Sequence, residues 1–156
     1  MVALSCSATP TRLSNPMPTE IRMERGPCFG ICPAYHVTLR SDGTLTYDGS
    51  MYVKHLGTWK ANFPLRSFRS LARTAEDVRF TTLKTDPTQA YDVQQTTVTV
   101  KLQTSQHSVH ENGNGRDGLH ALEQRIDSVI KSAHGWKRVR RPKGRWQIPD
   151  ERDTAT

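Results

Sequence analysis

The chain has 156 residues, which suits one domain with tails, and 35% of the residues are hydrophobic. No apolar run approaches the roughly 18 to 20 residues of a membrane-spanning helix. The formal net charge is +7, but seven basic residues between Lys131 and Trp146, with no acid among them, account for it. The remainder is close to neutral, so the charge does not mark the folded part as a nucleic-acid-binding domain.

The N-terminal segment, residues 1–20, is rich in Ser, Thr and Pro and predicts a flexible tether. Its Ala3-Leu4-Ser5-Cys6 stretch resembles the end of a bacterial lipoprotein signal, in which the cysteine is lipidated. A complete signal has a basic and an apolar segment before that cysteine. Lipidation of Cys6 therefore requires a translation start upstream of Met1, and the alternative is a disordered N-terminus with one exposed cysteine.

A β-hairpin is predicted next, because residues 35–40 and 44–47 both alternate between apolar and polar side chains. A two-residue loop would place the two apolar sets on opposite faces. A three-residue loop pairs Leu39 with Leu45 and keeps both sets on one face. We therefore predict a type I turn with a bulge and Gly43 in the left-handed region.

The other elements are read from periodicity and breakers. Asn62 is a good helix cap and Pro64 is tolerated in a first turn, so a helix is expected to start there. In chain order we expect a short strand at 21–24, a turn at Asp48-Gly49, a strand at 51–60, a helix at 64–78, a long loop at 81–94, a strand at 96–102, its hairpin partner at 106–110, and a helix from Leu119 to near Gly135.

These elements predict a two-layer α+β domain: an antiparallel sheet of about five strands with two helices on one face, in the order βββαββα. The domain is expected to cover residues 21–134. Residues 135–156 are expected to form a basic, disordered tail.

The stretch Arg25-Gly-Pro-Cys-Phe-Gly-Ile-Cys-Pro-Ala-Tyr35, with Asp42-Gly43-Thr44 and Tyr47-Asp48-Gly49, resembles the bacterial domain-of-unknown-function family 6438. The resemblance continues through the helix that contains Leu122-Glu123 and Ile126-Asp127, and covers about residues 20–133. Members often follow a secretion or lipoprotein signal, which implies the periplasm or cell envelope if the start lies upstream, and otherwise the cytoplasm. The family carries no established activity, so the resemblance implies no catalytic residue.

Cys28 and Cys32 allow three interpretations. A tight turn around Gly30 would bring their α-carbons within the 4.4–6.8 Å of a disulfide, which would fix the turn before the Tyr35 strand. Two thiolates would also suit redox chemistry or Cu(I). Because a strand rather than a helix follows, no helix N-terminus would lower a thiol pKa. The third interpretation is two free thiols packed as small apolar groups.

The histidines give little support for a metal site. His107 and His110 are three apart on a predicted strand, so they point to opposite faces. The remaining histidines are scattered: His36, His55, His120 and His134. No nucleophile motif or phosphate loop is present in the sequence, and the Asn-Gly repeat at 112–115 is interpreted as a turn. We expect no cofactor and no catalytic residue.

The basic tail interleaves tryptophans with cations, a pattern that suits single-stranded nucleic acid or anionic lipid head groups. A solvated tail with Trp136 packed back on the domain is the alternative. The polyanion-binding candidates are Trp136, Lys137, Arg138, Arg140, Arg141, Lys143, Arg145 and Trp146.

The sequence therefore favours a non-enzymatic, envelope-associated binding or accessory domain with a structural disulfide. Thiol redox or Cu(I) handling by Cys28 and Cys32, and polyanion binding by the tail, are the alternative functions.

Overall fold

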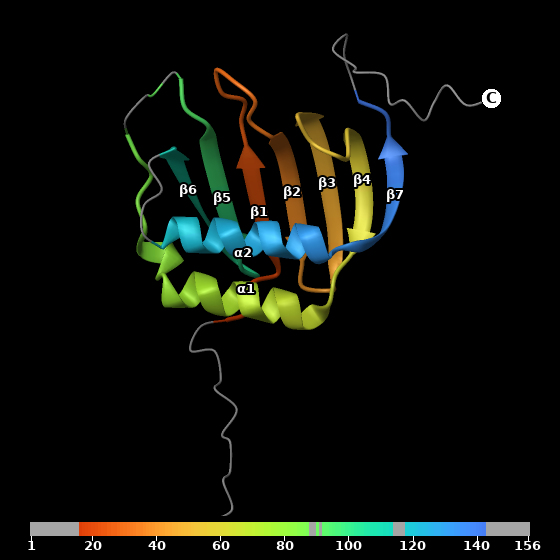
Figure 1. Cartoon of the computed structure of the whole chain (residues 1–156). Helices are drawn as coiled ribbons and strands as arrows, with labels where there is room; N and C mark the ends of the chain where they lie inside the picture. Colours follow the sequence, from red (N-terminus) through yellow and green to blue (C-terminus); the bar gives the residue numbers. More distant parts are fainter. Residues whose placement is uncertain (1–15, 88–89, 91, 114–117, 143–156) are drawn as a thin grey trace, which may run out of the picture.

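The computed structural model describes residues 16–87, 90, 92–113 and 118–142, which form one antiparallel sheet with two helices on one of its faces (Figure 1). The spatial order of the strands is β6-β5-β1-β2-β3-β4-β7. The elements are β1 (Glu20–Arg25), β2 (Ala34–Arg40), β3 (Thr44–Met51), β4 (Gly57–Asn62), α1 (Leu65–Asp77), a 3-10 turn η1 (Phe80–Thr82), β5 (Gln95–Lys101), β6 (Gln106–Asn112), α2 (Leu119–Ser132) and β7 (His134–Arg140). The predicted α+β class is confirmed, but the sheet has seven strands rather than about five.

Of the two additional strands, only one was expected from the sequence. β1 matches the short strand expected at 21–24, and it lies at the centre of the sheet between β2 and β5. β7 occupies part of the expected tail: residues 134–140 pair with β4 as an edge strand. The prediction of a disordered tail from residue 135 is therefore wrong up to Arg140, because an edge strand tolerates the exposed cations that made this stretch look unstructured. Residues 143–156 lie outside the described residues.

The predicted hairpin is confirmed in register and turn geometry. Leu39 pairs with Leu45, and Val37 pairs with Tyr47. Gly43 has φ of 84°, and its amide donates to the carbonyl of Arg40 at 3.0 Å. The common face of the two apolar sets therefore determined the loop length correctly.

Two local predictions are wrong. Asp48-Gly49 is not a turn but lies inside β3, and the chain reverses at residues 52–56 instead. Gly49 is needed there because the His55 carbonyl and the Val53 side chain fold against it, leaving no space for a Cβ atom. Asn62 is the last residue of β4 rather than a helix cap, and Pro64 occupies the N-cap position with an extended backbone.

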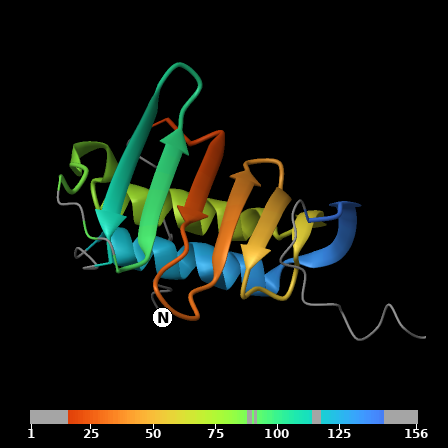
Figure 2. The same cartoon turned by 90° about the horizontal axis from the view of Figure 1, so that it is seen from above.

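The core lies between the sheet and the two helices, which run side by side under one face (Figure 2). The strands β1, β2, β3 and β5 contribute every second side chain, and the helices contribute residues at three- and four-residue spacing. Members with no more than 1% exposure include Ile21, Met23, Val37, Leu39, Leu45, Phe68, Leu71, Val98, Leu119, Leu122 and Ile126. Neither described helix is long and apolar enough to cross a membrane.

Candidate functional site

The cysteine loop, residues 26–33, connects β1 to β2. Cys28 and Cys32 are joined in a disulfide with their α-carbons 5.7 Å apart, within the normal range. The Gln94 side-chain amide donates to the carbonyls at both ends of the loop, Gly26 at 3.1 Å and Pro33 at 2.7 Å. The loop is therefore held both across its middle and at its base.

An ion network lies beneath this loop, between the end of the sheet and α2. Arg25 Nη2 lies 3.0 Å from Asp127 Oδ2 and 3.3 Å from Glu123 Oε2. The Tyr35 hydroxyl donates to Asp127 Oδ1 at 2.6 Å. Arg25 and Tyr35 are direct partners in the β1–β2 register, which brings both side chains to α2. We call Arg25, Tyr35, Glu123 and Asp127 the buried ion network.

Burial decides the protonation of two members. It raises the pKa of Glu123, and the neighbouring Glu111 carboxylate raises it too, whereas Arg25 lowers it; the resulting pKa is about 7. Burial also raises the pKa of Tyr35, and the hydrogen bond to Asp127 adds to that shift. Tyr35 therefore remains a protonated donor at neutral pH and holds Asp127 in place.

An aromatic cleft of about 680 Å³ opens next to the network, beside the C-terminal end of α2. Tyr35 and Tyr47 stack with ring centroids 5.1 Å apart, and His55 and Trp136 stack at 4.2 Å. Burial lowers the pKa of His55, and the nearby cations lower it further, so the ring is biased toward its neutral form. The cleft is also lined by exposed Tyr52, Lys54 and Lys131.

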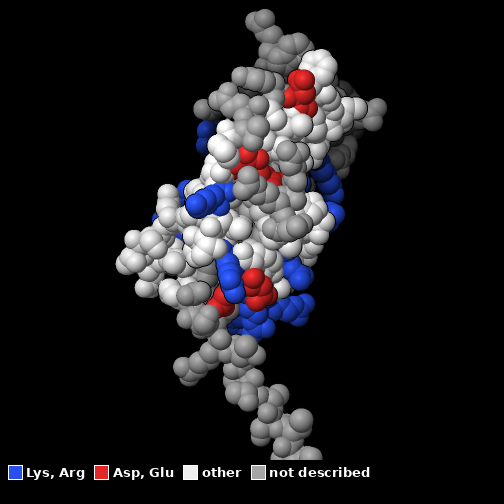
Figure 3. Space-filling view, turned by 90° about the vertical axis from the view of Figure 1, so that its left-hand side faces the viewer, with Lys and Arg blue, Asp and Glu red and all other residues white. Residues whose placement is uncertain are grey.

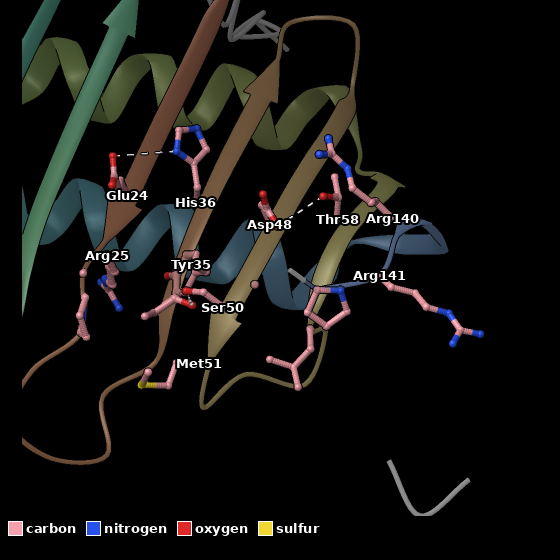
Figure 4. A pocket seen from close by; sticks show the side chains of 16 residues that line it. Glu24, Arg25, Tyr35, His36, Asp48, Ser50, Met51, Thr58, Arg140 and Arg141 are labelled. Atoms are coloured by element: carbon pink, nitrogen blue, oxygen red, sulfur yellow. Dashed lines mark hydrogen bonds and ion pairs between the residues drawn. The ribbon is translucent and has the colours of Figure 1, made fainter. Parts of the chain in front are cut away.

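A polar cleft of about 530 Å³ lies at the same end of the sheet and extends over its uncovered face (Figure 4). One cross-strand row supplies much of its lining: Glu24, His36, Asp48, Thr58 and Arg140 are successive partners across five strands. His36 Nδ1 lies 4.0 Å from a Glu24 carboxylate oxygen, and Thr58 donates to Asp48 at 3.3 Å. The row therefore presents acidic side chains, a basic side chain and a hydroxyl group to a polar ligand.

The predicted tail residues are divided between the two faces of β7. The Trp136 indole packs edge-on against Tyr47 and donates to the Ala133 carbonyl at 3.0 Å. The Arg138 guanidinium lies 4.8 Å from the centroid of the Trp59 ring on the same side. Arg140 lies in the row on the uncovered face, and Lys137 pairs with Lys60. Cys6, Lys143, Arg145 and Trp146 lie outside the described residues.

The predicted opposition of His107 and His110 is observed. His107 packs edge-on against Phe80 and hydrogen-bonds the Leu83 carbonyl at 2.9 Å. His110 hydrogen-bonds Thr97 at 2.9 Å on the uncovered face. Within the described part of the chain, no three His, Cys, Asp or Glu residues are grouped closely enough to hold a metal ion.

The sequence pattern alone predicted no role for the members of the buried ion network. One signal was available: Glu123 falls on the apolar stripe of α2, which the buried residues Leu119, Leu122 and Ile126 define. A charged residue on a buried stripe requires a partner, and that partner is Arg25. The identity of the partner was not accessible, because it depends on how β1 packs against α2.

Fold and site together define a class: a two-layer α+β domain whose antiparallel sheet carries a disulfide-closed loop above a buried ion network. The chain belongs to the domain of unknown function family DUF6438, which matches residues 19–130. The match includes the cysteine loop and the whole ion network, and it ends before β7. No curated protein sequence matches the chain.

Proposed function

We propose that the chain is a non-enzymatic binding domain of the bacterial cell envelope, that the aromatic cleft is its ligand site, and that Cys28–Cys32 is a structural disulfide. The observation that carries the proposal is the pairing of Arg25, Tyr35 and Asp127 beside the cleft. Arg25 and Tyr35 both bind the Asp127 carboxylate, so their role is to fix the cleft wall rather than to transfer protons. Oxidised cysteines fit an envelope compartment.

The chemistry of the cleft favours a ligand with a ring and an acidic group. Tyr52, which is 51% exposed, offers a ring surface on which a sugar or aromatic ring would stack. Lys54 and Lys131 are exposed at the same cleft and would pair with a carboxylate.

Two matched pairs of probes test this proposal: glucuronic acid with glucose, and benzoate with benzyl alcohol. Titration followed by tryptophan fluorescence should show saturable binding of an acid and about tenfold weaker binding of its neutral counterpart. Tyr52→Ala and Lys131→Met should weaken binding, whereas Lys60→Met on the uncovered face should not. Equal affinities across these variants contradict the cleft as the site. Turnover in an unbiased substrate screen, abolished by one substitution, contradicts a non-enzymatic role.

A thiol redox or Cu(I)-handling role is the second candidate, favoured by the short Cys28–Cys32 separation and by the half-burial of both residues. Against it, strands bound the loop on both sides, so no helix N-terminus stabilises a thiolate. Intact mass with and without reductant, followed by Cu(I) titration of the reduced protein, separates the two roles. A disulfide that resists reduction and no copper uptake would eliminate the redox and metal role.

Polyanion binding is the third candidate, supported by the pairing of Lys60 with Lys137 and by Arg140 on the same face. Charge reversal of Lys137 and Arg140 should then abolish salt-dependent binding to single-stranded DNA or heparin. Binding that is absent or insensitive to salt would rule it out.

A further inference from the structure

The cysteine loop exposes the two most accessible large apolar side chains among the described residues. Phe29 is 92% exposed and Ile31 is 82% exposed. They flank Gly30 inside the ring that the disulfide closes, and the Gln94 hydrogen bonds hold both ends of the loop. The loop is thus fastened in a shape that keeps both side chains away from the core.

Further apolar side chains lie at the same end of the sheet. Met51 is 40% exposed and Tyr52 is 51% exposed, at the turn between β3 and β4. Figure 1 shows that this turn, the cysteine loop and the end of β7 lie on one edge, with the cysteine loop reaching beyond the ends of β3 and β4. We call this edge, with Phe29, Ile31, Met51 and Tyr52, the apolar edge.

Cations accompany the apolar edge on its β7 side. Arg140 and Arg141 line the same polar cleft as Pro27 and Met51, but they lie across it from the cysteine loop, at the end of β7 (Figure 4). Seen from the β6 side, acidic and basic side chains are interspersed among uncharged ones, and several Lys and Arg gather toward the lower end (Figure 3). The exposed tip of the loop, Phe29 and Ile31, is apolar, and the two cations lie on the β7 side of the edge.

The shape of this edge distinguishes between a protein and a lipid surface. A stable protein interface buries about 800 Å² per partner and requires shape complementarity between the two surfaces. Phe29 and Ile31 instead project from a convex tip, which a bilayer accommodates without a complementary groove. Apolar and aromatic side chains enter the boundary of the acyl chains, and adjacent cations attract anionic head groups.

We propose that the apolar edge docks on an anionic membrane surface and inserts Phe29 and Ile31 below the lipid head groups. Arg140 and Arg141 bind head groups on the β7 side of the apolar edge, across the polar cleft from the inserted loop. The disulfide holds the loop in its inserting shape before contact, which removes the entropy cost of ordering the loop on binding. Tyr52 belongs to both the apolar edge and the aromatic cleft, so of that edge the test changes only Phe29 and Ile31, which lie outside the cleft.

Vesicle flotation of the full chain tests the proposal. The wild type should float with vesicles of phosphatidylcholine containing about a third phosphatidylglycerol, and much less with phosphatidylcholine alone. Phe29→Ser/Ile31→Ser should lower the partition coefficient at least about tenfold, because two apolar side chains no longer insert. Leu65→Ser is the matched control: Leu65 is 50% exposed at the start of α1, away from the apolar edge, and its replacement should leave flotation unchanged.

The Phe29→Trp variant measures separately how deeply the loop inserts into the bilayer. Its added fluorescence should shift to shorter wavelength on anionic vesicles and be quenched by brominated acyl chains. Far-UV circular dichroism and the thermal midpoint confirm that each variant is folded, which is expected because the replaced side chains are exposed. The proposal would be overturned if the wild type floated with neither kind of vesicle, if the double variant floated as well as the wild type, or if brominated lipids did not quench the Phe29→Trp variant.

Discussion

The two ends of the helix-covered face of the sheet are built on opposite principles. On β1, Met23 is fully buried among apolar side chains, whereas Arg25, two residues further on, is paired with Asp127 and Glu123. Burial of apolar area stabilises the first end without geometric demands. Buried charges contribute little net stability, but they are costly to leave unpaired. We infer that the apolar end holds the fold together and that the charged end fixes how α2 meets the cysteine loop.

The largest expected effect comes from the apolar end. Phe68→Ala removes a side chain that is 1% exposed in the first turn of α1, so it should reduce the free energy of unfolding by about 3–5 kcal/mol. Arg69→Ala, an exposed neighbour on the same helix, should change it by less than about 0.5 kcal/mol. Urea unfolding measures both. Similar values for the two variants would contradict this account of the core.

At the charged end, Arg25→Met should cost about 2–4 kcal/mol, because it leaves Asp127 and Glu123 without their cation. Replacing all three residues by apolar ones should restore part of the loss, because the unpaired charges of the network are removed although the Tyr35 hydroxyl loses its acceptor. The same urea series measures the single and the triple variant. A harmless single substitution would show that the network is not a constraint, and an unrecovered triple would show that it stabilises the fold directly.

The pH dependence of the free energy of unfolding tests the charged end specifically, through Glu123. The folded-state pKa of Glu123 is raised from its ordinary value of 4.5 to about 7, so the folded protein binds a proton more tightly than the unfolded chain. The stabilisation linked to Glu123 is complete below pH 4.5 and is lost as the pH rises through about 7, a change of about 1–3 kcal/mol. Glu123→Gln should remove this component of the pH slope, measured by urea midpoints between pH 5 and 8. An unchanged slope would contradict the raised pKa.

The apolar end was largely predictable from sequence, because periodicity reports which side chains share a face. The predicted pairing of Leu39 with Leu45 needed only alternation and a turn residue. The expected helices at 64–78 and from Leu119 correspond to α1 and α2. The predictions fail where tertiary contacts override local signals: Gly49 marks a close approach of the chain rather than a turn.

The charged end was not predictable, because its partners are distant in sequence. Arg25 and Glu123 are 98 residues apart, and only the packing of α2 on β1 and β2 brings them together. β7 was missed for a related reason: its pairing with β4 is a long-range contact, and its basic composition resembles a disordered tail.

The smallest expected effect concerns the disulfide, and it tests whether the charged end is a local structure. In a Cys6→Ala background, Cys28→Ala/Cys32→Ala should reduce the free energy of unfolding by only about 1 kcal/mol, because the bridge closes a very short loop. Hydrogen exchange should accelerate in residues 26–33 and remain unchanged in Val37 and Leu39 of the same β2 strand. Acceleration throughout β2 would mean that the disulfide supports the apolar end as well, and the division between the two ends would have to be abandoned.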